Sequence, residues 1–487
     1  MSIFKSFDMK KRSFSIILAL LFIAVSCKKG FVELQPVSTV SIDILFKTDK
    51  DYQDAIVGAY SVLRLQGPNI WLFGDLPSDD TEQQFLTSTS QVGIDNYSIP
   101  INDPILINTW RNYYAMISRC NTILSKIEGA DAAVITNKDK YTGEAKFLRA
   151  LAYFDLVRIF GDVPAVTKPI TNEQAYKTPR EKVDKIYDDI IIKDLLDAEA
   201  KLPLKYTGAD VGRATKGAAK SILGKAYLTR KDFAKAEAKL LEITTMGYSL
   251  LTNFNDLFDY QKDEHHSEYI FDIEYEENVS LGSPLTNTFA PAYAIVLNFY
   301  GITGQGGSAG SPSEEMFTLF PAGDKRKDIT VAKGYTDNNG TYIPIPTFDI
   351  RTFTKKYFTK TVRANDSKAN WKVIRYADVL LMLAEAMNEN GKTGAALPYY
   401  NLVHARAGLP ALSNLTQNEA RERIYLERRL ELYLEGQRWF DLVRTGRALA
   451  VLQPKGMKAY MTVFPIPLSQ IQLINDNTVF PQNPGYN

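Results

Sequence analysis

Apolar positions between residues 374 and 388 repeat with the period of an amphipathic helix. Gly391 ends this pattern, and a second helical pattern runs from 395 to 405. The apolar residues of the first helix are spaced so that they share one face: Ala377, Leu380, Leu381, Ala384 and Met387. This stretch therefore predicts two helices joined by a tight turn.

The two helices carry small residues at the spacing of a tetratricopeptide repeat. Ala396 stands 12 residues after Ala384, and a small residue on each helix allows the pair to pack closely. The same offset separates Gly224 from Ala236, where residues 223–227 read LGKAY. Two copies of one spacing predict a repeat.

Two looser copies extend the pattern towards the N-terminus. Residues 54–64 are expected to pair with 111–125, and residues 144–159 with 183–200. Ordinary helical hairpins are the alternative, because any two amphipathic helices joined by a turn match this spacing in part. Both interpretations predict a mainly α fold, in which tetratricopeptide-like helical hairpins form a scaffold with long irregular loop insertions and few short strands.

Two regions lack helical periodicity. Residues 66–103 and 280–370 are rich in Gly, Pro, Ser, Thr and Asp, and both carry aromatic residues. Irregular regions of this length are uncommon unless they are functional. Residues 269–275 combine aromatic and β-branched side chains, which predicts a strand.

The last helical pattern, from 424 to 447, places Glu427, Glu431 and Glu435 on one helical face. Like charges at i, i+4 repel unless cations intervene. Three arginines on the same stretch are close enough to do so: Arg428, Arg438 and Arg444. We expect an ion-pair network here; a glycosidase acid–base pair is the less favoured alternative, because it requires two carboxyl groups with separated pKa values.

The N-terminus carries an export signal. Basic residues precede an apolar run, 14–25, that is too short to span a membrane but suits a signal peptide. Residues 24–27, AVSC, resemble a bacterial lipobox, although Ala24 stands where such signals usually have Leu. Cys27 is therefore predicted to be lipidated; ordinary cleavage near Ser26 is the alternative. The chain divides into a signal peptide (1–27), a tether (28–48), a helical region (49–250), an irregular insertion (251–370) and a C-terminal helical region with a tail (371–487).

The segment 427–444 follows the pattern ER-x-x-EL-x-x-EG-x-R-x-x-DL-x-R and resembles the C-terminal signature of the SusD/RagB family. The match extends over essentially the whole mature chain. Its other pieces are residues 31–36, 148–164, 214–228, 268–275, 375–386 and 465–486. The resemblance implies a SusD-like helical fold and a cell-surface lipoprotein of Bacteroidetes.

Composition excludes several other classes of function. The chain is 45% hydrophobic and 11% aromatic, which indicates a globular protein. Its net charge of +1 gives no reason to expect nucleic acid as a partner. The motifs of serine hydrolases, zinc proteases and nucleotide-binding enzymes are absent from the sequence. Cys120 is predicted to be a buried, inert thiol. We therefore predict a protein that is not an enzyme and has no cofactor or metal.

Sugars present flat C–H faces and many hydroxyl groups, so their binders need exposed aromatic rings and planar hydrogen-bonding groups. Both irregular regions supply such residues, although each aromatic could instead fix its loop to the core, and each Asp could cap a turn. The candidates are Trp71, Asp79, Asp80, Gln83 and Tyr97 from the first region, and Tyr293, Asn298 and Tyr300 from the second.

The family resemblance implies a function for these residues. It implies an oligosaccharide-binding lipoprotein, exposed at the surface of the outer membrane, that delivers its ligand to a SusC-like TonB-dependent barrel. A peptide-binding or scaffolding surface protein is the main alternative, because tetratricopeptide grooves commonly bind peptides. A glycoside hydrolase is the least favoured interpretation.

Overall fold

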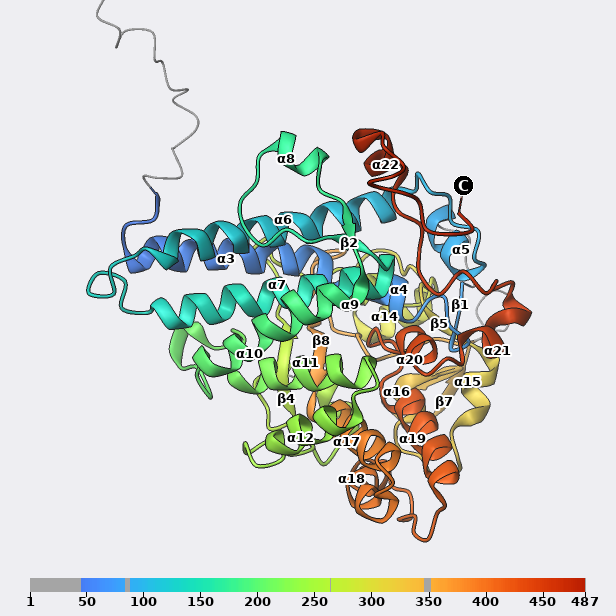
Figure 1. Ribbon diagram of the computed structural model, residues 1–487. Helices are drawn as coiled ribbons and strands as arrows, with labels where there is room; N and C mark the ends of the chain where they lie inside the picture. The colour runs from blue at the N-terminus through green and yellow to red at the C-terminus, as the bar shows by residue number, and fades with distance from the viewer. Residues whose placement is uncertain (1–44, 84–87, 263, 346–351, 487) are drawn as a thin grey trace, which may run out of the picture.

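The structure is a computed structural model that describes residues 45–83, 88–262, 264–345 and 352–486. Cys27, the signal peptide and most of the tether lie outside the described residues. Figure 1 shows a stack of helices from α3 and α6 to α18 and α19, with short strands and helices beside it. The prediction of a mainly α fold with few short strands is confirmed.

Helical hairpins build the stack, and the predicted helix pairs are all present. Each hairpin packs on the next along the chain, through contacts of α3 with α7, α10 with α11, α12 with α17 and α17 with α19. The pairs are α3 (Asp49–Gln66) with α6 (Pro104–Glu128), α7 (Lys138–Phe160) with α10 (Ile192–Lys201), α11 (Lys216–Thr229) with α12 (Phe233–Ile243), and α17 (Tyr376–Glu389) with α18 (Thr393–Arg406).

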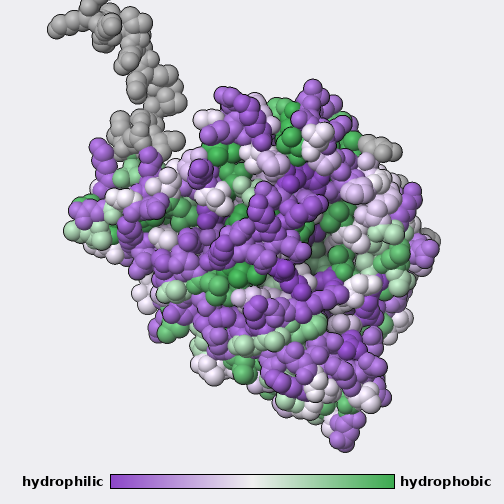
Figure 2. Space-filling model, viewed as in Figure 1, coloured by the Kyte–Doolittle hydropathy of each residue, from purple (hydrophilic) through white to green (hydrophobic). Residues whose placement is uncertain are grey.

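Small residues set the close approach within a hairpin. A Cβ atom at Gly224 would lie 2.5 Å from a methyl carbon of Leu240, and Ala236 is fully buried on the facing helix. Residues with larger side chains would separate the two helices, as the tetratricopeptide spacing predicts. Figure 2 shows the outer face of the stack as largely hydrophilic, with apolar side chains in stripes between polar ones.

Four two-stranded antiparallel sheets occur in the described residues. The pair β4 and β8 confirms the predicted strand and adds a partner strand immediately before α17. The pair β1 and β5 joins the two irregular regions. The sheets are β1 (Thr81–Glu82) with β5 (Ser311–Pro312), β2 (Val163–Pro164) with β3 (Arg180–Glu181), β4 (Tyr269–Ile273) with β8 (Trp371–Arg375), and β6 (Gly334–Thr336) with β7 (Tyr342–Pro344).

The irregular regions contain more helix than their sequence predicts. Turns of helix interrupt both regions, because tertiary contacts stabilise segments too short to show a helical period.

The remaining elements, inside and outside the irregular regions, are η1 (Gly67–Ile70), α4 (Trp71–Gly74), α5 (Thr89–Asp95), α8 (Asn172–Tyr176), α9 (Val183–Ile186), η2 (Tyr187–Ile191), η3 (Gly208–Asp210), η4 (Phe254–Phe258), α13 (Leu285–Phe289), α14 (Ala294–Tyr300), α15 (Glu314–Leu319), α16 (Lys327–Thr330), α19 (Gln417–Glu431), α20 (Arg438–Arg444), α21 (Ala448–Leu452), η5 (Gln453–Lys455) and α22 (Leu468–Ile474).

The helix predicted from 424 to 447 is broken in the middle. Its first part, α19, ends at Glu431, and α20 begins at Arg438. The turn between them contains Leu434 and Gly436, whose φ angles are 57° and 74°. A left-handed backbone conformation is costly for leucine, so the surrounding contacts must hold this turn.

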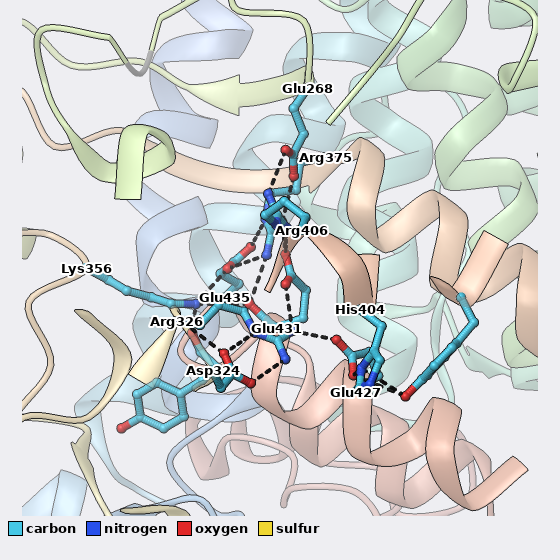
Figure 3. A network of polar contacts seen from close by, with 12 residues as sticks. Glu268, Asp324, Arg326, Lys356, Arg375, His404, Arg406, Glu427, Glu431 and Glu435 are labelled. Atoms are coloured by element: carbon cyan, nitrogen blue, oxygen red, sulfur yellow. Dashed lines mark hydrogen bonds and ion pairs between the residues drawn. The ribbon is translucent and has the colours of Figure 1, made fainter. Parts of the chain in front are cut away.

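A buried network of charged side chains provides those contacts (Figure 3). Arg375, at the end of β8, donates to Glu268 at 2.8 Å, to Glu435 at 2.7 Å and to Glu431 at 2.5 Å. Lys356 donates to Glu435 at 2.8 Å and to two backbone carbonyls of the same turn. The network therefore fixes both the side chains and the backbone of the turn.

Further cations reach the same carboxylates from distant parts of the sequence. Arg326 donates to Glu427 at 2.6 Å and to Glu431 at 2.9 Å, and Arg406 also pairs with Glu431. Burial raises the pKa of Glu431, but the guanidinium groups of Arg406, Arg375 and Arg326 outweigh burial and hold that pKa well below its usual range. Glu431 is therefore ionised in the core.

The expected network exists, but the expected cations were wrong. The three arginines on the same stretch pair with other acids: Arg428 with Asp378 and Asp441, Arg438 with Asp79, and Arg444 with Glu385. The cations that neutralise the three glutamates come from β8, α18 and the irregular insertion.

Asp75 ties the first irregular region to the same turn. Its carboxyl group accepts hydrogen bonds from the backbone N–H of Gly436 at 2.6 Å and of Gln437 at 3.4 Å. Burial raises the pKa of Asp75 to about 8, since an ionised carboxylate is poorly solvated there. Asp75 is therefore mainly protonated at neutral pH.

Replacing Glu431 with Gln tests the network. The substitution leaves three buried guanidinium groups without a shared counter-charge, so we expect the free energy of unfolding to fall by about 3–5 kcal/mol. The control is Glu422→Gln on the same helix, because Glu422 is 64% exposed in its pair with Arg447 and such pairs contribute about 0–1 kcal/mol. Equal effects of the two substitutions in urea unfolding would contradict the network's role.

Asp75→Asn tests the buried carboxyl group. As pH rises from the usual pKa of 3.8 towards about 8, the unfolded chain loses the Asp75 proton while the native chain retains it. The native protein should therefore lose up to about 1.4 kcal/mol of stability per pH unit relative to the variant. Urea unfolding of both proteins between pH 5 and 9 measures this difference; a pH-independent difference would refute the raised pKa.

Candidate functional site

The first irregular region places its aromatic candidate in the core. Trp71 is only 3% exposed, and its ring meets Phe289 of α13 edge-on at a centroid distance of 5.2 Å. The expectation of an exposed platform at Trp71 is therefore wrong. A large ring at this point fills the space between α4 and the second irregular region.

The two acidic candidates form ion pairs inside the protein. Asp79 accepts hydrogen bonds from both Nε and Nη2 of Arg438, at 2.9 and 2.8 Å, and Arg429 pairs with both Asp79 and Asp80. Burial raises the pKa of Asp79, but the hydrogen bond and the charge of Arg438 lower it by a larger amount. The pKa of Asp79 is therefore below its usual value. Both carboxylates fix the segment to α19 and α20, which corrects the expectation that they face a ligand.

Gln83 and Tyr97 also hold this region together. The Gln83 backbone N–H donates to Asp95 at 3.2 Å. The Tyr97 hydroxyl donates to the carbonyl of Pro77, and its ring packs at 6.0 Å from that of Trp439. Both side chains are half-buried. The side chains of the first irregular region therefore make structural contacts within the protein.

The second irregular region brings its three candidates together on α14. Tyr293 is the N-cap residue of this helix, Tyr300 is its last residue, and Asn298 is exposed on it. Gly301 ends the helix with a φ of 66°, a conformation that glycine adopts readily. A helix of two turns therefore presents two half-buried tyrosines and one amide.

A small apolar cluster, separate from the main core, supports α14. Its buried members are Val296, Ala332, Tyr335, Ile345 and Phe353. Phe299 packs on Tyr335 with ring centroids 4.4 Å apart, and Tyr300 meets Phe358 edge-on at 5.1 Å. The cluster therefore fixes the rings of Phe299 and Tyr300 on one side, while part of each ring remains exposed to solvent.

Two further aromatic residues of the second irregular region, Phe299 and Tyr342, were not among the candidates. Phe299 follows Asn298 on the helix, and Tyr342 on β7 is 53% exposed. Strand β7 pairs with β6, whose Tyr335 contacts the rings of Phe299 and Tyr300. Burial, and then the charge of Asp328, raises the pKa of both Tyr300 (to about 12) and Tyr342. We call the surface of Tyr293, Asn298, Phe299, Tyr300 and Tyr342 the aromatic face.

The aromatic face can bind a flat, hydroxyl-bearing ligand. Among the described residues, the hydroxyl groups of Tyr300 and Tyr342 have no hydrogen-bond partner. Ring faces can pack against C–H groups, while the two hydroxyls and the Asn298 amide can exchange hydrogen bonds. This is the arrangement that the sugar-binding argument required, although it comes from one irregular region instead of two.

Other kinds of site find little support in the described ranges. Residues 45–83, 88–262, 264–345 and 352–486 contain no group of three or more His, Cys, Asp or Glu placed to hold a metal ion. No helix within those ranges is long and apolar enough to cross a membrane. Cys120 is fully buried, and burial raises the pKa of its thiol to about 12, which confirms the predicted inert thiol.

Two family models match the chain. One, described as the SusD family, matches residues 329–486. The other, described as starch-binding associating with outer membrane, matches residues 31–228. Between them they cover both the N-terminal hairpins and the C-terminal block with the ion network.

Individual relatives match over most of their length. SusD-like protein P25 of Formosa agariphila is 28% identical, over 96% of this chain and 97% of its own. Starch-binding protein SusD of Bacteroides thetaiotaomicron is 26% identical, over 76% of each chain.

The solved structures agree in fold. A laminarin binding SusD-like protein has a TM-score of 0.77 and 27% identity, over 91% of this chain and 100% of its own. Surface glycan-binding protein A from Bacteroides thetaiotaomicron, in complex with laminarihexaose, has a TM-score of 0.76 at 23% identity, over 90% of this chain and 99% of its own. The chain belongs to the SusD/RagB family of glycan-binding proteins associated with the outer membrane.

Proposed function

We propose that this protein captures an oligosaccharide on the aromatic face at the cell surface. A lipid on Cys27 anchors it in the outer membrane, and it delivers the oligosaccharide to a SusC-like TonB-dependent barrel. It performs no chemistry on the ligand. The observation that carries the proposal is the aromatic face itself, in which accessible rings and an exposed amide are held on a rigid cluster.

The geometry of the aromatic face favours an extended oligosaccharide; it is less suited to a ligand that the protein would enclose deeply. Tyr342 stands 53% exposed on β7, while Tyr293 and Tyr300 are half-buried at the two ends of α14. Successive sugar rings can pack on separated aromatic rings, and their edges then remain open to solvent. A ligand held in this way keeps free ends, which suits transfer to a partner.

The family supports the choice of ligand class. The laminarin binding SusD-like protein, at 27% identity, has a glycan ligand in its name, and one matching family model is described as starch-binding. The proposed delivery to a barrel is supported by the family resemblance, and the proposed lipid anchor by the AVSC motif at residues 24–27. Peptide capture is the rival function, and it enters the test below.

Removing rings from the aromatic face should weaken oligosaccharide binding without unfolding the protein. Isothermal titration of the mature chain with neutral hexasaccharides and with hexapeptides identifies the ligand class. The Tyr300→Ala/Tyr342→Ala variant should bind the identified oligosaccharide at least about tenfold more weakly, a loss of about 1.4 kcal/mol. The control is Tyr176→Ala, because Tyr176 is 43% exposed on the distant element α8 and should have no effect.

Two results of this titration would count against the proposal. Unchanged affinity of a folded double variant would remove the aromatic face from the binding site. Binding of hexapeptides but of no hexasaccharide would replace glycan capture with peptide capture.

Cys27→Ala tests the anchor. Without a thiol to acylate, the protein should leave the membrane fraction and appear in the soluble fraction of its native host, since acyl chains contribute about 0.8 kcal/mol per buried methylene to membrane binding. Fractionation and blotting measure the distribution. Full retention of the variant in the membrane would contradict anchoring by lipid alone and would point to retention by a partner.

A further inference from the structure

A cleft lies among the helical hairpins, formed by elements other than those of the aromatic face. Its walls are the loop from α10 to α11 (residues 202–215), the segment after α12 (245–248) and the approach to β4 (265–270). The cleft has a volume of about 730 Å³, within the range of about 300–1,000 Å³ typical of ligand sites.

Three tyrosine rings line the cleft, and each is held in place by a contact. The Tyr206 hydroxyl donates to Glu144 at 3.1 Å, and the Tyr269 hydroxyl donates to Glu274 at 2.9 Å. The Tyr248 ring packs at 6.0 Å from that of Tyr376. The rings are therefore positioned before a ligand arrives, which reduces the entropy lost on binding.

His266 supplies a hydrogen-bond donor without a partner. Its Nδ1 accepts from the backbone N–H of Glu268 at 3.1 Å, so in the neutral ring the proton is on Nε2. Burial lowers the pKa of His266 to about 3, which keeps the ring neutral. In the described part of the chain, Nε2 is buried and has no hydrogen-bond partner, an arrangement that costs about 1–3 kcal/mol.

The charged groups of the cleft are mostly neutralised within the protein. Arg213 pairs with Glu144 at 3.2 Å and with Asp210 at 3.0 Å, and Lys205 is exposed on the loop. The walls also carry the charged Lys205, His265 in a pair with Glu274 at 2.8 Å, and three uncharged hydroxyl groups, those of Thr215, Thr245 and Ser267. Rings, hydroxyls and a neutral donor match a ligand that is itself neutral and rich in hydroxyl groups.

We propose that this cleft is a second binding site, which takes a neutral oligosaccharide independently of the aromatic face. The proposal rests on the geometry of the cleft and goes beyond capture on the aromatic face. A ligand hydroxyl accepts the hydrogen bond of His266, and sugar rings pack against the tyrosines. Two sites on one chain would hold two segments of a long glycan, or two oligosaccharides, at once.

The test uses the mature Tyr300→Ala/Tyr342→Ala variant as background, so that the cleft is measured alone. Saturation-transfer NMR and isothermal titration are performed with laminarihexaose, maltohexaose, cellohexaose and xylohexaose at millimolar concentration. At least one of these hexasaccharides should still bind. Adding Thr245→Trp, which places a bulky side chain at the exposed rim of the cleft, should weaken that binding at least about tenfold.

The matched control is Thr244→Trp, because Thr244 precedes Thr245 but does not line the cleft. It should leave binding within about twofold, equivalent to about 0.4 kcal/mol. His266→Phe keeps a ring and removes the donor, so it should also weaken binding. Thermal unfolding confirms that each variant is folded.

Two outcomes would overturn the proposal. One is that none of the four hexasaccharides binds the background variant. The other is residual binding that Thr245→Trp and His266→Phe leave unchanged. If the first outcome occurs while the native protein still binds oligosaccharide, the second site is refuted and the aromatic face remains the capture surface.

Discussion

Glu431 lies fully buried and ionised among three guanidinium groups, and the C-terminal half of the molecule depends on that arrangement. Its partners Arg326, Arg375 and Arg406 come from the irregular insertion, from β8 and from α18. A buried carboxylate with no cation is very costly, so the segments must assemble together or not at all. The network thus joins elements that are separated by more than a hundred residues of sequence.

The turn held by this network is the base to which the irregular regions attach. Asp75 caps the turn through the backbone of Gly436, and Asp79 is clamped by Arg438 on α20. Strand β1 then pairs with β5, which belongs to the second irregular region. In this way α14 and β7 stand on a rigid support, although their own segment has little regular structure. A rigid support is what a weak, multi-ring sugar contact needs, because ordering the site during binding would cancel much of the affinity.

The helical hairpins could be predicted from sequence because their signal is local. The 12-residue offset from Gly224 to Ala236 reflects direct contact between neighbouring helices, and the structure contains each predicted pair. The partners of the three glutamates could not be predicted, since charge spacing on one helix favours Arg428 while the actual partner Arg326 is about a hundred residues away.

The candidate site was predictable only in part, for the same reason. Trp71 and Tyr300 are both aromatic residues in irregular sequence, and nothing local distinguishes them. Trp71 is buried because Phe289 meets it from the other region, while Tyr300 ends a short helix at the surface of a small cluster. Phe299 and Tyr342 lie within the second irregular region, but only tertiary structure shows that Phe299 and the β6–β7 hairpin, which carries Tyr342, pack beside Tyr300.

A crystal structure of the mature chain with the tightest-binding hexasaccharide tests the central claim most directly. Capture on the aromatic face predicts sugar rings packed against Tyr300 and Tyr342, with a sugar hydroxyl bonded to the Asn298 amide and the backbone of α14 unmoved. An aromatic face that stays empty at saturating sugar, while the oligosaccharide occupies another part of the protein, would contradict the account.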